Sequence, residues 1–159
     1  MIIKSFGPKP GAVKSASVHI AHQIRYCSQT QERGEQDELR PLLTNCAADD
    51  SRGLIDEFKS ISTLRPDLKN PTRHVVLSPE SGDRILTPEE WQRAVDIYRQ
   101  ERGLGDAPYV AYLHDDGHDG RHPHHLHVFF CALDPMDRQF QTHGTHLSTA
   151  RPAGESRKS

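Results

Sequence analysis

The sequence predicts an α+β domain of two layers, in which helices cover one face of a central antiparallel sheet. Strand-like apolar runs at 108–113 and 126–133 are joined by a polar hairpin, and strands joined in this way pair antiparallel. A third such run, at 73–78, comes just before the clearest helical pattern in the chain, at 87–102. We expect this helix and a second one at 50–64 to cover the sheet face opposite the polar side chains of the hairpin.

The first half of the chain gives weaker signals. Residues 1–5 are short and apolar enough for a strand, and the prolines and glycine of 8–11 predict a loop. The segment 17–26 fits either a helix or an irregular segment, and the Gln-, Glu-, Arg- and Gly-rich stretch 28–41 predicts an exposed loop. A helix is expected to begin at 49–51, where any of the three side chains can cap it.

The two predicted helices are recognised by their apolar stripes and their ends. The stripe of the first recurs at helical spacing and consists of Leu54, Ile55, Phe58 and Ile61. The stripe of the second consists of Trp91, Ala94, Val95 and Tyr98. A capping box over 87–90, with proline at the first helical position, begins this second helix. Gly103 or Gly105 is expected to end it.

Composition limits the class of protein. At 159 residues with 34% hydrophobic residues, the chain predicts one compact domain over 1–135, followed by a polar, disordered tail over 136–159. The formal net charge of −2 excludes a bulk basic signature for nucleic acid, so DNA binding would need a local positive patch. The chain lacks an apolar run of membrane-spanning length and an N-terminal signal-peptide core. We therefore expect a bacterial cytoplasmic protein with no membrane insertion.

Three cysteines, Cys27, Cys46 and Cys131, lie far apart in the chain and form no CxxC pair. An odd number with this spacing does not suit a disulfide scaffold. We expect reduced, partly buried thiols.

The histidine-rich hairpin carries the candidate chemistry. His125 and His127 alternate with Leu126, so both imidazoles leave the same face of a strand. His114, at the end of the neighbouring strand, would bring a third nitrogen to a shared metal site with room for a substrate oxygen. Asp116 is placed to accept a hydrogen bond from a ligand's second ring nitrogen. Three imidazoles leave a divalent ion its full charge, which suits polarising a phosphate oxygen.

The histidine cluster has other interpretations as well. The run could be solvated and bind no metal, or it could form a closed structural zinc site with a fourth ligand such as His122 or His124. The doubled His124-His125 also leaves two registers open. Alternation with His127 favours His125, because His124 would point the other way.

Several segments in order resemble a known family. These are Asn45-Cys46, Ile55-Asp56-Glu57-Phe58, Leu64 to Pro71, His74-Val75-Val76-Leu77-Ser78, Leu86 to Trp91, Gly103-Leu104-Gly105-Asp106, Tyr109 to Asp116 and His122 to Val128. Over residues 40–130 the chain is similar to the relaxase domain of plasmid mobilisation proteins, of the MobA/VirD2 type among the HUH endonucleases. The resemblance implies a palm-like antiparallel sheet that nicks one DNA strand at a transfer origin through a covalent 5′-phosphotyrosyl intermediate. It places the metal ligands at His114, His125 and His127 and the orienting carboxylate at Asp116.

The resemblance also implies a cofactor and partners. Magnesium or manganese is the family's metal, although imidazoles accept zinc, nickel and cobalt as well. The partners implied are single-stranded DNA at the origin, accessory relaxosome proteins and a secretion-system coupling protein.

Tyr26 is the candidate nucleophile among four tyrosines. Tyr98 belongs to an apolar helical stripe, and Tyr109 and Tyr112 lie on opposite faces of a strand, so these three suit packing. Tyr26 has polar neighbours and matches the relaxase pattern of an N-terminal nucleophile. No tyrosine follows His127, which disfavours the related replication initiators and transposases.

The candidate phosphate contacts are Arg25, Lys4, Arg73 and Arg121. Two alternative functions remain at this point. The chain ends sooner than most relaxases, so a truncated, non-catalytic remnant that binds origin DNA is one of them. The other is a metal-dependent phosphodiesterase that uses activated water.

Overall fold

The structure is a computed structural model. It describes residues 1–6, 16–28, 39–67, 71–80, 82–114 and 124–131. Asp116, Arg121 and the predicted tail over 136–159 lie outside these residues.

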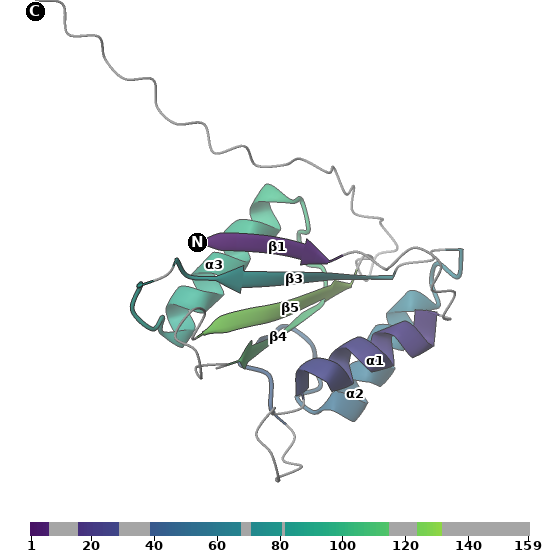
Figure 1. The fold of residues 1–159 in the computed structure, drawn as a ribbon. Helices are drawn as coiled ribbons and strands as arrows, with labels where there is room; N and C mark the ends of the chain where they lie inside the picture. The colour runs from purple at the N-terminus through teal and green to yellow at the C-terminus, as the bar shows by residue number, and fades with distance from the viewer. Residues whose placement is uncertain (7–15, 29–38, 68–70, 81, 115–123, 132–159) are drawn as a thin grey trace, which may run out of the picture.

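Five strands form one antiparallel sheet in the order β1-β3-β5-β4-β2 (Figure 1). They are β1 (Ile2–Phe6), β2 (Leu43–Thr44), β3 (Thr72–Ser78), β4 (Tyr109–His114) and β5 (His125–Cys131). The antiparallel sheet and the α+β class are as predicted. The edge strand β2 was not predicted, because two residues are too few to show alternation.

Three helices complete the described fold: α1 (Ala16–Ser28), α2 (Ser51–Ser62) and α3 (Pro88–Glu101). Asp50 caps α2 by accepting a hydrogen bond of 2.9 Å from the backbone N–H of Gly53. Thr87 and Glu90 form the predicted capping box of α3, and Gly103, with φ of 62°, follows its end. The segment 17–26, which the sequence left open, is helical.

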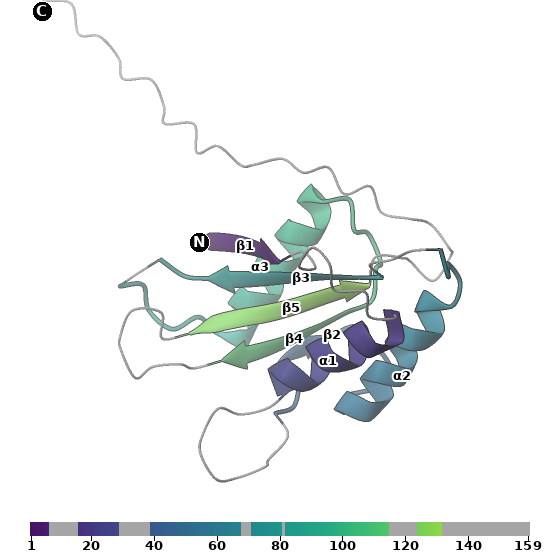
Figure 2. The same ribbon diagram turned by 45° about the vertical axis from the view of Figure 1, so that its right-hand side comes forward.

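The placement of the helices differs from the prediction that they share one face. Only α3 packs on the face formed by residues such as Val75, Leu126 and Val128. Helices α1 and α2 pack on the other face, which is also the face of the predicted histidine site (Figures 1 and 2). The physical reason is that β4 and β5 are apolar on both faces. Tyr112 and Phe129 point away from α3, and without α1 and α2 their rings would face water.

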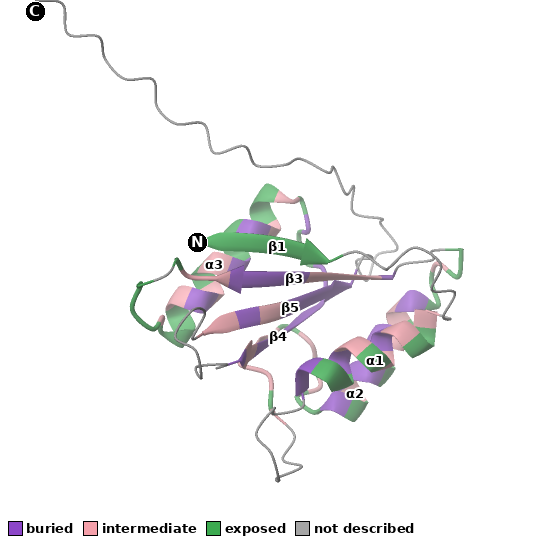
Figure 3. Cartoon of the chain, in the orientation of Figure 1, coloured by how far each residue is buried: buried purple, intermediate pink, exposed green. Residues whose placement is uncertain are grey.

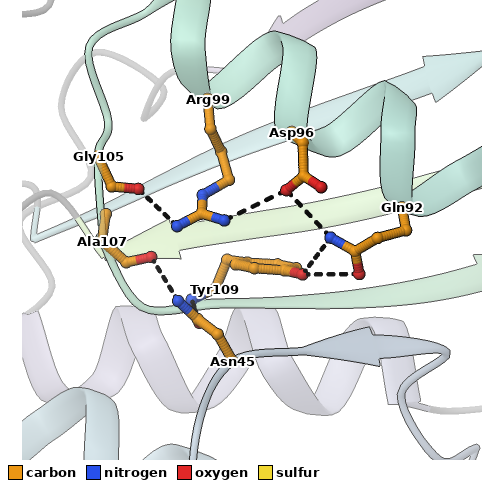
Figure 4. A network of polar contacts seen from close by, with 7 residues as sticks. All are labelled: Asn45, Gln92, Asp96, Arg99, Gly105, Ala107 and Tyr109. Carbon is orange, nitrogen blue, oxygen red and sulfur yellow. Dashed lines mark hydrogen bonds and ion pairs between the residues drawn. The ribbon is translucent and has the colours of Figure 1, made fainter.

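Polar contacts fasten one end of β4 to its neighbours (Figure 4). Asn45 accepts a hydrogen bond of 2.7 Å from the backbone N–H of Tyr109. The Tyr109 hydroxyl contacts the Gln92 side chain of α3, and the Arg99 guanidinium lies 5.1 Å from the centre of the Tyr109 ring. Arg99 also forms an ion pair with Asp96. The network fixes β4 to α3 and to the segment that precedes α2.

Strand β1 is exposed along its whole length, whereas the three central strands are largely buried (Figure 3). Helices α1 and α2 pack on β4 and β5 residues of the histidine face, at a distance from β1 (Figure 2). Within the described residues, no helix is both long and apolar enough to span a bilayer. The three cysteines are free thiols, as predicted, with Cys27 and Cys131 buried.

Two aliphatic residues of α3 test the packing of this helix. Val95 is fully buried and Ile97 is 51% exposed. We expect Val95→Ala to lower the free energy of unfolding by about 2 kcal/mol, because it removes buried methyl groups and leaves a cavity. The matched Ile97→Ala variant should change it by less than about 0.5 kcal/mol. Urea denaturation followed by circular dichroism measures both, and equal losses would show that α3 does not bury the stripe described.

Candidate active site

Three imidazoles meet on one face of the sheet, at the edge where β4 ends and β5 begins. His114 and His125 are direct cross-strand partners, and His127 is paired with Tyr112. One ring nitrogen from each of the three histidines lies within 4.8 Å of the others. The ring centres are 4.5 Å apart for His114 and His127, and 4.9 Å apart for His125 and His127. The alternation expected from the sequence therefore holds in the structure, with Leu126 pointing to the opposite core.

The same register decides which of the adjacent residues His124 and His125 faces the site. His125 is the first residue of β5 and faces His114, whereas His124 precedes the strand. His124 belongs to neither of the donor groups that the described residues form. The structure thus brings His125, and not His124, together with His114 and His127.

Burial keeps the ring of His127 neutral. Its pKa falls from 6.5 to about 3, mainly through burial and then through the neighbouring rings of His114, His74 and His125. A neutral imidazole keeps a lone pair on one nitrogen, which is the form that binds metals. The ring of His127 is therefore ready to accept a cation at neutral pH without losing a proton first.

His74 of β3 supports His127, a role that was not predicted from the sequence. Its Nε2 lies 2.8 Å from Nδ1 of His127. The His74 ring is stacked between Phe6 and Phe129, with ring centres 5.1 Å and 4.4 Å away. Burial, followed by the charge of His114, lowers the pKa of His74 to about 4. When Nδ1 of His127 donates this hydrogen bond to Nε2 of His74, the ring of His127 is oriented and its Nε2 keeps the lone pair for a ligand.

A backbone carbonyl of α1 supports His114. Nε2 of His114 donates a hydrogen bond of 2.8 Å to the carbonyl oxygen of Cys27, in the last turn of the helix. Such carbonyl partners fix the tautomer of a metal-binding histidine and raise its basicity. While this bond is in place, Nδ1 of His114 is the nitrogen left to ligate. Asp116, predicted from the sequence for the orienting role, lies outside the described residues.

Tyr26 immediately precedes Cys27 and is 54% exposed. The buried side of α1 is formed by Ile20, Ile24 and Cys27, so the phenol of Tyr26 projects from the solvent side of the same turn. The backbone of Tyr26 is thus one residue away from the carbonyl that holds His114. The other three tyrosines are buried: Tyr98 and Tyr109 lie in the core beneath α3, and Tyr112 lies in the core beneath α1 and α2.

The cations named from the sequence do not all lie on this side of the sheet. Lys4 is the cross-strand partner of Val76, which is the partner of His127, so Lys4 shares the histidine face. Arg25 is exposed beside Tyr26 on α1. Arg73 is the cross-strand partner of Phe130. Its side chain is therefore on the face of the sheet that α3 covers, away from the histidines.

These donors fit a divalent cation. Three imidazoles offer nitrogens within 4.8 Å of one another, and two of these rings are held by hydrogen bonds at their second nitrogens, which matches the ligand number of an open metal site. The group contains no carboxylate, so it would leave the charge of the cation uncompensated. Such an arrangement suits binding and polarising an anionic oxygen.

Comparison with known proteins adds one finding. The family model described as "Relaxase: MobA/VirD2-like, nuclease domain" matches residues 26–154, which is more than half of the chain. The matched range extends into the segment that the sequence analysis assigned to a tail. No curated protein and no solved structure gave a match.

The buried imidazoles make the metal-free protein sensitive to acid. Both rings titrate near 6.5 when unfolded, but the pKa is about 4 for His74 and about 3 for His127 in the fold. The unfolded chain binds more protons below pH 6.5, so the free energy of unfolding falls as the pH drops from there toward 4. We expect a slope of at most about 1.4 kcal/mol per pH unit for each ring.

Urea denaturation in the presence of a chelator, from roughly pH 7 down to roughly pH 4.5, measures this slope. The His74→Phe variant keeps an aromatic ring between Phe6 and Phe129 but cannot titrate. Its slope should be shallower than that of the wild type over the same window. Identical slopes would show that His74 titrates normally in the folded state.

Proposed function

The chain belongs to the MobA/VirD2-like nuclease domains of the relaxase family, and from this premise we propose that it nicks and rejoins one DNA strand at a transfer origin. Domains of this family act as nucleases in DNA mobilisation. The proposed reaction passes through a covalent 5′-phosphotyrosyl intermediate on Tyr26. The single observation that carries the proposal is the convergence of His114, His125 and His127 next to the helix end that bears Tyr26.

His114, His125 and His127 would hold the divalent cation. When bound, it supplies positive charge that draws electron density from a phosphate oxygen and offsets the charge that develops in the transition state. His74 and the Cys27 carbonyl keep two of the three rings oriented, which preserves the geometry between turnovers. Magnesium and manganese are the proposed ions, with zinc, nickel and cobalt as alternatives that imidazoles also bind.

Tyr26 is the proposed nucleophile because it combines exposure with proximity to the cluster along the backbone. Its phenolic oxygen attacks the scissile phosphorus, the bond from phosphorus to the 3′ oxygen breaks, and the 5′ phosphate stays on the tyrosine. The phenol gives up its proton to solvent as the bond forms, and the released 3′ oxygen takes one up. The phosphotyrosine bond keeps the energy of the phosphodiester, so attack by a 3′ hydroxyl rejoins a strand without ATP.

The β1 side of the histidine face is the proposed path of the DNA strand. Lys4 lies on this face in the same cross-strand row as His127, and Arg25 lies beside Tyr26. Both can pair with phosphates on either side of the scissile bond. Phe6 is 50% exposed next to His74 and offers a ring on which an unpaired base can stack. Accessory relaxosome proteins and a coupling protein are further proposed partners, supported by the family alone.

The Tyr26→Phe variant tests the nucleophile. We expect it to lose covalent attachment to a single-stranded origin oligonucleotide by on the order of a thousandfold or more, because the attacking oxygen is absent. The matched control is Tyr98→Phe, which removes a hydroxyl from the core beneath α3 and should retain attachment. The readout is a protein–DNA species that resists denaturant on a gel.

Other outcomes of this experiment separate the alternatives. A covalent adduct in Tyr26→Phe would place the nucleophile elsewhere. Free 5′-phosphate products that persist in the variant would indicate a phosphodiesterase that uses water. DNA binding by the wild type without any cleavage in magnesium or manganese would indicate a non-catalytic origin-binding protein.

Two neighbouring histidines test the metal ligands. We expect His125→Gln to reduce nicking at least about a hundredfold, because it removes one donor from the group of three. The matched His124→Gln variant changes a residue outside that group and should keep most of the activity. The comparison is made with manganese at the same concentration for both variants. Loss of activity in His124→Gln alone would reverse the assignment.

A further inference from the structure

A second group of donor atoms lies beside the three histidines. Cys27, His74 and His127 each offer one ligand atom, and these atoms lie within 4.8 Å of one another. The three residues come from α1, β3 and β5, so only the folded chain brings them together. Cys27 is fully buried, and its thiol belongs to the core side of α1 rather than to the exposed side of Tyr26.

The chemistry of this group differs from that of the three imidazoles. A thiolate with two imidazoles is a soft donor set, which prefers zinc, cobalt or copper to magnesium. Magnesium favours oxygen ligands and keeps its waters, so it gains little from sulfur. Zinc and cobalt can bind imidazoles in either group, but only the second group adds sulfur, so we expect thiophilic cations to favour it and magnesium to avoid it.

We propose that Cys27, His74 and His127 form a site for a thiophilic divalent cation such as zinc, and that its occupancy switches off the nicking site. Binding forms one bond to sulfur and two to nitrogen, and the thiol proton is released to solvent as the bond to sulfur forms. The binding of the cation stands on the geometry of the three donors. Its inhibitory consequence rests on the proposed function.

His127 belongs to both donor groups, so the two sites cannot be occupied by cations at the same time. A neutral imidazole carries one lone pair, so His127 can ligate one cation at a time. Its Nδ1 already faces His74 at 2.8 Å. When that nitrogen binds a cation with Cys27 and His74, the proton must lie on the other nitrogen, and His127 is lost to His114 and His125. A cation at the second site would also hold the helix turn that carries Tyr26, through the adjacent Cys27.

Cobalt titration of the full chain tests the site, because cobalt reports sulfur ligation through a thiolate-to-metal charge-transfer absorption in the near ultraviolet. We expect this absorption in the wild type at one cobalt per chain, and its loss in Cys27→Ser. The matched Cys46→Ser variant removes a thiol that lies outside both donor groups and should retain it. Absence of the absorption in the wild type, or its persistence in Cys27→Ser, would overturn the proposal.

A second variant guards against misfolding, since Cys27→Ser places a hydroxyl in a fully buried position. His74→Phe keeps the aromatic stack with Phe6 and Phe129 and removes only the donor nitrogens. We expect it to weaken cobalt and zinc binding at least about tenfold and to abolish the charge-transfer absorption. Unchanged affinity and absorption in a folded His74→Phe protein would contradict the site.

Zinc inhibition then separates this inference from the proposed function. Nicking with manganese is measured with increasing zinc, and each variant is compared with its own rate without zinc. The zinc concentration for half inhibition should rise at least about tenfold in Cys27→Ser. Equal inhibition of Cys27→Ser and wild type would overturn the competition between the sites.

The His125→Gln variant completes the separation. It retains Cys27, His74 and His127, so it should keep the cobalt–thiolate absorption while losing nicking. If the wild type fails to nick but shows the absorption, the proposed function fails and the second site stands. If the wild type nicks but shows no absorption, the second site fails and the proposed function stands.

Discussion

The pairing of β4 with β5 is the constraint on which the candidate site depends. The register that joins His114 to His125 also places His127 on the same face, two residue pairs further along the strands. A slip of one residue would turn both β5 imidazoles toward α3 and expel Leu126 and Val128 from the core they now fill. The apolar face of the sheet therefore selects the register, and the register assembles the polar cluster on the other face.

Helix α1 both packs on one face of the sheet and contacts the candidate site. Its buried side helps to close the core over Tyr112 and Phe129, and its last turn supplies the carbonyl that orients His114. The same turn carries Tyr26 on its solvent side and Cys27 on its buried side. Packing, ligand orientation and the candidate nucleophile thus depend on the position of one helix end. A shift of that end would disturb all three together.

The parts of the fold with strong local signals could be predicted, and the parts that depend on contact between distant segments could not. The capping box at Thr87 and the alternation of His125 with His127 are properties of a few neighbouring residues, and both are found in the structure. Strand β2 is too short for any periodicity to show. The roles of His74 and of the Cys27 carbonyl arise from contacts across 53 and 87 residues of sequence, which no local pattern reports.

By itself the sequence determined the α+β class, the antiparallel pairing around the histidine hairpin and which imidazoles share a face, because strand alternation and helix capping are local steric and hydrogen-bonding rules. Only the tertiary structure decided that α1 and α2 cover the histidine face, that Arg73 points away from it, and that His127 lies between two sets of donors. These outcomes depend on which buried surfaces pack together. The positions of the side chains from β3, β5 and α1 depend on one another, so they are fixed only when the whole core is packed.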